Sequence, residues 1–422
     1  MKSLLSSASH PYLRAVRRVP AFLVLLCLLA TGLQSRAQDR SERFIGPGVR
    51  HLRWSLPDGP ISLQAVEVDR AEAFIQLGVS VGMTDNTFSL APLSRQAEQL
   101  TRPDRYPIAG VNGDFFYYPN TQQRGIPTNA AVLDGELLRT PFPRSCLRID
   151  ASGNLSISIL RFRGTVKLPD STEASIHAVN APRRPNQLVV YTPRYGATTR
   201  TDRSGVEVYL QPEDFPLRHG VTQRATVRAV QRGAGDAALN PGTWVLSASG
   251  TAATALRSLA PNDVVELRVD FIPGLGPNDQ VLGGGPRLVR DGKVSVEDEG
   301  GSVGGAFASR RHPRTAIGFN GSKVYLVVAD GRRPGYSVGM TLPELAQAMV
   351  DLGCTDALNM DGGGSSVLWI RGEIVNKPSD GRERPVANGL LVFSTAPKGD
   401  PVRLVAQPTE IAALPGAEIP LS

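Results

Sequence analysis

Short runs of β-forming apolar residues, separated by tight turns, recur through most of the chain. Three turn dipeptides lie between such runs: Asp134-Gly135, Asp291-Gly292 and Asn320-Gly321. An Asn-Gly or Asp-Gly pair in this setting is the strongest short-range signal for a two-residue hairpin. The pattern therefore predicts antiparallel hairpins, with the apolar run Val324–Ala329 as a buried central strand.

One helix is well marked by its periodicity and its ends. Thr341 and Glu344 have the spacing of a capping box, and Gly353 is placed to end the segment. Apolar residues recur between them at helical spacing, at Leu342, Leu345, Ala346, Met349 and Val350. A shorter helix is expected over about residues 93–100. Few helices among many strands predict an α+β fold with antiparallel or mixed sheets.

Composition changes along the chain in a way that predicts domains. Residues 160–280 combine strand-like runs with Arg-rich and Pro-rich connections, and lack the dense Gly-Asp motifs of the flanking regions. We interpret them as an inserted β-rich subdomain in a domain made of residues 38–159 and 281–396. Residues 397–422 are either a tail or the first strands of a truncated immunoglobulin-like module.

The first 37 residues have the layout of a signal peptide. A basic stretch precedes the apolar run Ala21–Ala30, and Ser35-Arg36-Ala37 offers small residues for cleavage. We therefore expect a secreted or periplasmic protein, with no stable membrane insertion after cleavage. An uncleaved anchor is the alternative, although the apolar run is short for a membrane span.

Net charge and cysteine content exclude several classes. The formal charge of +7 comes largely from residues 1–37, which hold five of the 46 basic residues and no acidic one, so no nucleic-acid partner is expected. Cleavage leaves Cys146 and Cys354, which form one disulfide or stay as buried thiols. Without CxxC or paired histidines, we expect no metal and no cofactor.

The densest candidate chemistry lies in the segment 359–366, with the sequence NMDGGGSS. Three consecutive glycines allow close approach of a ligand and can turn several N–H groups toward an anion. Asp361 adds a carboxylate, and Ser365 and Ser366 add hydroxyls. A wide glycine turn without a ligand is the alternative.

A second cluster follows the apolar residues 107–111. Asn112 offers an amide to a sugar hydroxyl or a phosphate oxygen, and Asp114 offers a carboxylate. The rival interpretation is a plain turn, because Asn-Gly and Gly-Asp pairs are typical turn sequences.

A third cluster is basic and flanks a predicted hairpin. Arg311 and Arg314 precede its first strand, while Asp330 and Arg332 follow its second, so the hairpin should bring the two ends together. The planar guanidinium group suits a phosphate. Solvated surface arginines are the alternative.

Taken together, these motifs resemble a known family. The runs NGDFF, GGGP with LVRDGKV, PRTAIG, ADGRRPGYSVGMTLPELA, ALNMDGGGSS and VNKPSDGRERPVANGL occur in that order. The chain is similar, over about residues 45–395, to the phosphodiester glycosidase family. The resemblance implies an α+β catalytic domain and hydrolysis of a sugar-1-phosphate diester, with an N-acetylglucosamine-like or envelope-polysaccharide sugar as substrate.

The reaction explains why these residue types would occur together. A phosphate monoester is a weakly basic leaving group that needs charge neutralisation more than protonation, so arginines and glycine amides can replace a general acid. Asp361 is the first candidate for the catalytic carboxylate and Asp330 the second. The candidate substrate-binding and phosphate-binding residues are Asn112, Asp114, Arg311, Arg314, Arg332, Gly362, Gly363, Gly364, Ser365, Ser366 and Arg384. The rival functions are a phosphodiesterase attacking phosphorus and a non-catalytic binder of phosphate-bearing glycans.

Overall fold

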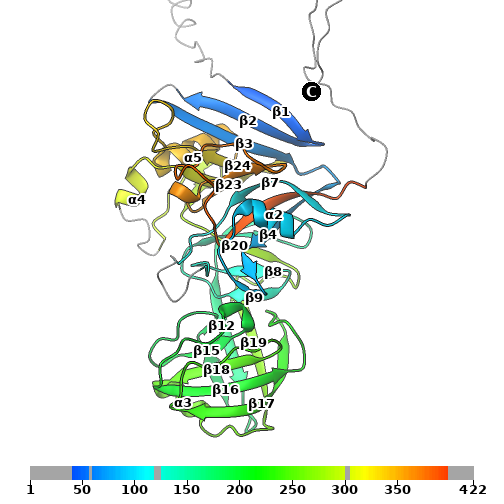
Figure 1. The fold of residues 1–422 in the computed structure, drawn as a ribbon, viewed down its shortest axis with the longest axis vertical. Coiled ribbons are helices and arrows are strands. Elements are labelled where there is room, and N and C mark those ends of the chain that lie inside the picture. Colours follow the sequence, from blue (N-terminus) through cyan, green and yellow to red (C-terminus); the bar gives the residue numbers. More distant parts are fainter. Residues whose placement is uncertain (1–39, 57–58, 118–124, 300–304, 398–422) are drawn as a thin grey trace, which may run out of the picture. The chain divides into compact units, whose positions relative to one another are not determined.

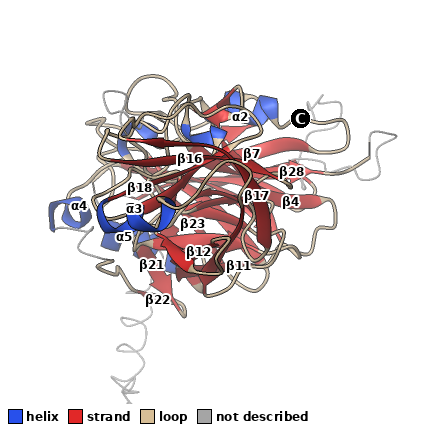
Figure 2. Ribbon diagram, turned by 90° about the horizontal axis from the view of Figure 1, so that it is seen from below, coloured by secondary structure: helices blue, strands red, loops and turns tan. Residues whose placement is uncertain are grey.

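Strands dominate the described part of the chain, which comprises residues 40–56, 59–117, 125–299 and 305–397 of the computed structural model (Figure 1). Figure 2 shows how few helices accompany them. The predicted α+β class is confirmed. The predicted signal peptide, residues 1–37, lies outside the described residues, as does all of the segment 397–422 except Pro397.

Two sheets form the centre of the fold. Sheet 1 has the strand order β1 (Ser41–Gly46), β2 (Val49–Leu56), β3 (Ile61–Asp69), β24 (Lys323–Ala329), β23 (Arg314–Phe319), β25 (Asp356–Asn359), β21 (Arg287–Arg290) and β22 (Lys293–Val294). Sheet 2 has the order β27 (Glu373–Ile374), β26 (Leu368–Ile370), β7 (Tyr106–Asn112), β28 (Asn388–Ser394) and β4 (Ile75–Val81). In Figure 1 the early strands β1–β3, in blue, lie beside β24 and β23 from the later chain.

Alternation of side chains along the strands builds the layers. Leu326 on β24 and Leu390 on β28 enter one core shared by sheets 1 and 2. The next residue along, Val327, faces a second core with the helix α5 (Leu342–Asp351). On sheet 2, Leu391 likewise faces the helix α2 (Leu93–Gln99). The period of two thus gives each sheet a helix on one face and the other sheet on its opposite face.

Two further sheets and a short hairpin complete the described strands. Sheet 3 has the order β11 (Leu155–Ile159), β10 (Ser145–Ile149), β20 (Gln280–Gly283), β8 (Ala131–Leu133) and β9 (Glu136–Arg139). Sheet 4 has the order β13 (Glu173–Ile176), β12 (Arg161–Lys167), β19 (Val264–Ile272), β17 (Thr222–Arg232), β16 (Gly205–Pro212), β18 (Trp244–Ser249), β15 (Leu188–Tyr191) and β14 (Ala178–Val179). The separate hairpin pairs β5 (Met83–Thr84) with β6 (Thr87–Phe88).

Sheet 4 uses strands from the region predicted as an insertion, and it has its own hydrophobic core, with Val208 and Leu246 among the buried residues. The predicted domain boundaries themselves stay a prediction. The remaining helical segments are short: α3 (Ala253–Leu256), α4 (Gly305–Ser309), η2 (Pro193–Tyr195), η3 (Gly250–Ala252) and η4 (Gly363–Ser365).

Two of the three turn dipeptides, Asp134-Gly135 and Asp291-Gly292, have positive φ at both residues, whereas Asn320-Gly321 lies in a three-residue connection between β23 and β24 and has positive φ at neither residue. Asp134-Gly135 connects β8 to β9 with positive φ at both residues, as a type I′ turn requires. At the start of α5, the Thr341 hydroxyl accepts from the amide of Glu344, and the Glu344 carboxylate accepts from the amide of Thr341. The capping box is therefore confirmed.

The two cysteines belong to different cores. Cys146 and Cys354 are both buried and unpaired, and burial raises the pKa of the Cys354 thiol to about 12. Of the disulfide and free-thiol alternatives, the structure shows the free thiols. Within the described ranges, none of the helices combines the length and apolar character needed to cross a bilayer.

The polar and charged candidate residues lie at the ends of strands in the two central sheets. β7 ends at Asn112, β25 ends at Asn359, and β24 ends just before Asp330. β23 runs antiparallel to β24 and β25, so its first residue, Arg314, lies at the same edge. The three candidate clusters therefore leave the two central sheets at one end.

Candidate active site

Backbone hydrogen bonds join the three candidate clusters. The amide of Asp361 donates to the carbonyl of Gly113 at 2.9 Å, and the amide of Gly363 donates to the carbonyl of Pro313 at 2.9 Å. The side-chain amide of Asn112 donates to the carbonyl of Asp361 at 2.7 Å. The glycine-rich segment is thus fixed between the ends of β7 and β23.

The Asp361 carboxyl group lies partly exposed at this junction. Its Oδ1 accepts from the amide of Gly362 at 2.8 Å, and Ser365 also hydrogen-bonds to the carboxylate. Burial raises the pKa of Asp361 to about 6, and the charge of Asp114 pushes it in the same direction, while Arg384 opposes the shift. A carboxyl group with this pKa can gain and lose a proton near neutral pH.

Asp114 is a second, fully buried carboxyl group beside the first. Its Oδ2 accepts from the amide of Asn129 at 2.7 Å, and its Oδ1 lies 3.5 Å from Nη2 of Arg144. Burial raises the pKa of Asp114 to about 6, against the opposing charge of Arg144. The charge of Asp114 adds a small upward contribution to the pKa of Asp361.

Two arginines lie against the glycine turn. A Cβ atom on Gly363 would sit 3.0 Å from Nη2 of Arg332, and one on Gly364 would sit 2.0 Å from Nη2 of Arg384. Gly363 also has φ +64°, a region that favours glycine. Both guanidinium groups approach the turn closely because these positions have no side chains. Nη1 of Arg384 also donates to Oγ of Ser365 at 3.3 Å.

Arg332 has an unusual backbone conformation. It is exposed and has φ +58°, which is strained for a residue with a Cβ atom. Its Nη2 lies 3.4 Å from Nδ1 of His312. Such strain often accompanies functional positions, because the surrounding structure must hold the residue in place.

Arg314 points elsewhere. Its side chain is 1% exposed, and its guanidinium donates to the carbonyls of Met340, Phe307 and Arg310 at 2.6–3.0 Å. Burial lowers the pKa of Arg314 to about 10, and the nearby charge of Arg332 adds to this shift. These contacts tie α4 and the start of α5 to β23.

Three other candidates also have structural partners. Arg311 forms an ion pair with the carboxylate of Glu344. Asp330 is buried and accepts from the Tyr336 hydroxyl at 2.9 Å and from the Asn376 amide group at 3.0 Å. Burial raises the pKa of Asp330, which reaches the glycine-rich segment indirectly, since Asn376 also donates to the carbonyl of Ser366.

The amide groups of the glycine segment are partly occupied. The amide of Gly362 donates to Asp361 and that of Gly363 to Pro313, so neither is free to form an anion nest in this conformation. Asn112 is also committed, because its Oδ1 accepts from the Thr315 hydroxyl at 2.8 Å. Arginine side chains are therefore the better-placed anion donors.

Sequence reasoning missed the residues that support Asp114. Asn129 and Arg144 contact its carboxylate, and Oδ1 of Asn388 accepts from its backbone amide at 2.7 Å. Arg144 lies in a loop without a recognisable motif. Asn388 belongs to the last run quoted for the resemblance, but its Asn-Gly sequence suggests a turn, whereas it begins β28.

Aromatic rings flank this site. Phe115 and Phe307 make an edge-to-face contact with ring centroids 5.9 Å apart. The Arg144 guanidinium lies 4.9 Å from the centroid of Phe115, and that of Arg314 lies 4.9 Å from the centroid of Phe307. In the described residues, no group of three or more His, Cys, Asp or Glu side chains is placed to hold a metal ion.

Solved structures share this fold. A hypothetical protein from Synechocystis has 20% identity and a TM-score of 0.68, over 85% of this chain and 64% of its own. A putative exported protein from Burkholderia pseudomallei K96243 has 23% identity and a TM-score of 0.62, over 79% of this chain and 74% of its own. At these identities the likeness establishes the fold.

A curated relative matches a shorter stretch. The SPbeta prophage-derived uncharacterized protein YomE of Bacillus subtilis (strain 168) is 34% identical over 82 residues. That stretch is 19% of this chain and 13% of the relative, so the chain covers only a small part of its length.

The family comparison concerns the part of the chain that holds most of the site. The phosphodiester glycosidase model matches residues 218–393, a range that includes Asp361, Arg332 and Arg384, whereas Asp114 precedes it. The resemblance carried by the ordered motifs is thereby confirmed: residues 218–393 of this chain match the model of the phosphodiester glycosidase family.

Proposed function

We propose that the protein is an exported hydrolase that cleaves the bond between the anomeric carbon and the phosphate oxygen of a sugar-1-phosphodiester. One observation carries the proposal. The Asp361 carboxyl group, whose pKa is about 6, lies beside a glycine turn against which Arg332 and Arg384 pack. The match of residues 218–393 to the phosphodiester glycosidase model supports this class of reaction.

The arginines are assigned to the phosphate. Arg332 is exposed and therefore accessible to a ligand, whereas Arg384 is partly exposed and would have to share its guanidinium with Asp380, to which it is ion-paired at 2.7 Å. Two guanidinium groups neutralise the negative charge that grows on the departing phosphate monoester. Because that leaving group is weakly basic, it can depart without a proton from a general acid.

Asp361 is assigned to the sugar side. A carboxylate next to a bound phosphate is repelled by it, so its favourable target is the positive charge that develops at the anomeric carbon, or the attacking water. The glycosidic C–O bond breaks and its electron pair leaves with the phosphate. In a direct route, the water oxygen forms the new C–O bond and Asp361 accepts the water proton. In a covalent route, an Asp361 oxygen first bonds to the anomeric carbon; water then attacks that carbon, the bond to Asp361 breaks, and the released carboxylate takes the water proton.

The neighbouring residues position this machinery. Asn112 holds the backbone of Asp361, and Asp114 supplies the nearby negative charge that helps to raise its pKa. Asp330 orders the loop that contains Asn376. Their direct contact with substrate, expected from the sequence, stays a prediction.

The test is hydrolysis of the methyl phosphodiester of N-acetylglucosamine-1-phosphate in ¹⁸O-labelled water, with products identified by mass spectrometry. Cleavage at carbon places the label in the sugar and releases unlabelled methyl phosphate. Label in the phosphate would show attack on phosphorus instead. If neither this diester nor its glucose and galactose counterparts are hydrolysed, while the protein still binds them, a non-catalytic binder replaces the proposed hydrolase.

Export is a separate part of the proposal. The signal-like segment 1–37 supports it through its order of basic, apolar and small residues. N-terminal sequencing of protein recovered from the periplasm or medium should begin near Gln38. A sequence that begins at Met1 would instead favour an anchor.

A further inference from the structure

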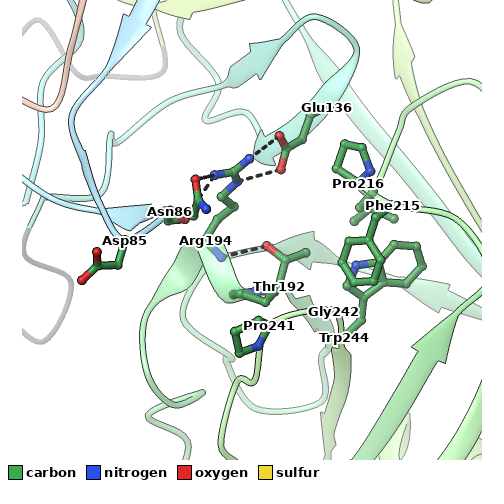
Figure 3. A pocket seen from close by; sticks show the side chains of 12 residues that line it. Asp85, Asn86, Glu136, Thr192, Arg194, Phe215, Pro216, Pro241, Gly242 and Trp244 are labelled. Atoms are coloured by element: carbon green, nitrogen blue, oxygen red, sulfur yellow. Dashed lines mark hydrogen bonds and ion pairs between the residues drawn. The ribbon is translucent and has the colours of Figure 1, made fainter. Parts of the chain in front are cut away.

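A cavity lies away from the glycine turn. It has a volume of about 240 Å³ and is bordered by the turn between β5 and β6, by β9, by η2, and by loops that flank strands of sheet 4 (Figure 3). The proposed hydrolysis uses none of the residues that line it. One side of the cavity is lined by apolar residues and the other by polar residues, and the two sides together restrict the class of ligand that can bind.

The apolar side is aromatic. Phe215 is 44% exposed, although it packs on Trp244, with ring centroids 5.5 Å apart and planes inclined by 58°. Trp244 is fully buried, and its Nε1 finds no hydrogen-bond partner among the residues that the structure describes. Pro216 and Pro241 extend this surface (Figure 3). A large exposed ring above a buried tryptophan is a ready platform for a flat apolar face.

The polar side is held rigidly. Nε and Nη2 of Arg194 donate to the two carboxylate oxygens of Glu136 at 2.8 and 2.9 Å, and Nη1 donates to Oδ1 of Asn86 at 3.2 Å (Figure 3). The exposed Asp85 carboxylate adds a further acceptor at the rim. The ion pair fixes the orientation of the Arg194 guanidinium and of the Glu136 carboxylate. The carboxylate oxygens keep lone pairs that can accept hydrogen bonds from a ligand.

We infer that this cavity binds one neutral sugar ring of a saccharide. A pyranose has an apolar C–H face that can stack on Phe215, and hydroxyl groups that can donate to Glu136, Asn86 and Asp85. An anion is disfavoured because two carboxylates line the cavity and the charge of Arg194 is already neutralised. The volume is below the ~300 Å³ at which drug-sized sites begin, so it suits a single ring.

Strand β8 relates this cavity to the candidate active site. Asn129, which binds the Asp114 carboxylate, lies two residues before β8, and the hairpin then turns to Glu136. The four residue steps from Asn129 to Leu133 span at most roughly 14 Å. If the proposed function holds, the cavity can accept a sugar farther along the same glycan, so this last step rests on that function.

The binding claim is tested on a glycan array with the whole chain. The Phe215→Ala variant should lose binding about tenfold or more for glycans that the unaltered protein retains. Phe74→Ala is the matched control, because Phe74 is 42% exposed and does not line the cavity. Asp85→Asn keeps a residue that tolerates the φ of +49° there, and should weaken binding by roughly threefold or more without affecting folding.

Two outcomes overturn the inference. One is that no arrayed glycan depends on Phe215 or Asp85. The other is that a polyproline peptide competes for the cavity while saccharides do not, since aromatic and proline-lined grooves also bind such peptides. Hydrolysis of the methyl phosphodiester should stay within about twofold in Phe215→Ala. If no diester is hydrolysed but Phe215-dependent glycan binding persists, the proposed function fails and the binding site stands.

Discussion

The amide of Asp361 hydrogen-bonds to the carbonyl of Gly113 at 2.9 Å, and this contact joins the two segments that carry Asp361 and Asp114, both carboxyl groups of raised pKa. Asp114 follows Gly113 directly, so the bond links the end of β7 to the glycine-rich segment. Buried carboxyl groups of raised pKa are typical of sites that perform acid–base or nucleophilic chemistry.

Replacement of Asp361 tests its catalytic role. Asp361→Asn keeps the shape and the acceptor for the Gly362 amide but removes the negative charge. We expect substrate binding to stay within about tenfold, while kcat falls by ~10³-fold or more, because the interaction is stronger in the transition state. Steady-state kinetics and calorimetric titration measure the two quantities. Normal turnover in Asp361→Asn, with Asp330→Asn inactive, would show that Asp330, and not Asp361, is the catalytic carboxylate.

The pH dependence of the reaction reports the same group. If ionised Asp361 is the active form, kcat/KM should fall about tenfold per pH unit below about pH 6. Asp114→Asn removes a charge that raises the pKa of Asp361, so the acidic limb should move to lower pH. A pH–rate profile of both proteins decides this. An activity that instead declines above pH 6 would mean that Asp361 acts in its protonated form.

Local sequence signals predicted local structure well. Hairpin dipeptides have φ requirements that few other structures satisfy, and the capping box at Thr341 satisfies orphan amides within a few residues. These interactions depend on neighbours in sequence. The pairing of β3 with β24 depends on residues far apart in the chain, and neither turn chemistry nor periodicity specifies such a partner.

The candidate site was only partly predictable for the same reason. Residue type drew attention to Asp361 and Arg332, and the structure brings both to one turn, although their functional roles stay a prediction. Residue type could not tell that the Arg314 guanidinium would turn toward backbone carbonyls, since that depends on where α4 ends. The contact between Arg144 and Asp114 likewise requires sheet 3 to pack beside β7, and no sequence motif predicts that packing.

Arg332 allows activity and stability to be separated. Arg332→Gly removes the guanidinium and also the strain of φ +58°. We expect kcat to fall roughly 10²-fold, while the free energy of unfolding rises by about 1 kcal/mol. Arg332→Ala should lose the same activity without the gain in stability, and Arg332→Lys should recover little, because the planar fork is lost. Full activity in all three variants would place the phosphate elsewhere. Exposed Arg382 provides the control.

Arg314 should behave in the opposite way. Arg314→Ala leaves three backbone carbonyls without their donors in a buried setting, so the protein should lose about 2–4 kcal/mol of unfolding free energy. Arg310→Ala removes an exposed side chain from the same segment and should change stability by less than about 0.5 kcal/mol. Denaturant unfolding compares the two. A stable Arg314→Ala protein that fails to bind the diester would restore the phosphate-binding role expected from the sequence.

Asp361 should also leave a signature in stability. Its pKa is about 6 in the folded protein and near 3.8 when unperturbed, so the folded chain holds the proton more tightly. Folding is therefore favoured by this group at low pH, and that contribution is lost as pH rises from about 4 to about 6.

The side chain introduced by Asp361→Asn is neutral at every pH, so the variant does not lose this stability as pH rises. We expect the variant to be more stable than the unaltered protein by roughly 1–3 kcal/mol at pH 8, and by almost nothing at pH 4. Denaturant unfolding at both pH values measures this difference, with Asp351→Asn, at the exposed end of α5, as the control. An Asp361→Asn protein destabilised equally at both pH values would show that the carboxylate mainly holds the glycine turn through hydrogen bonds, as Asx turns do.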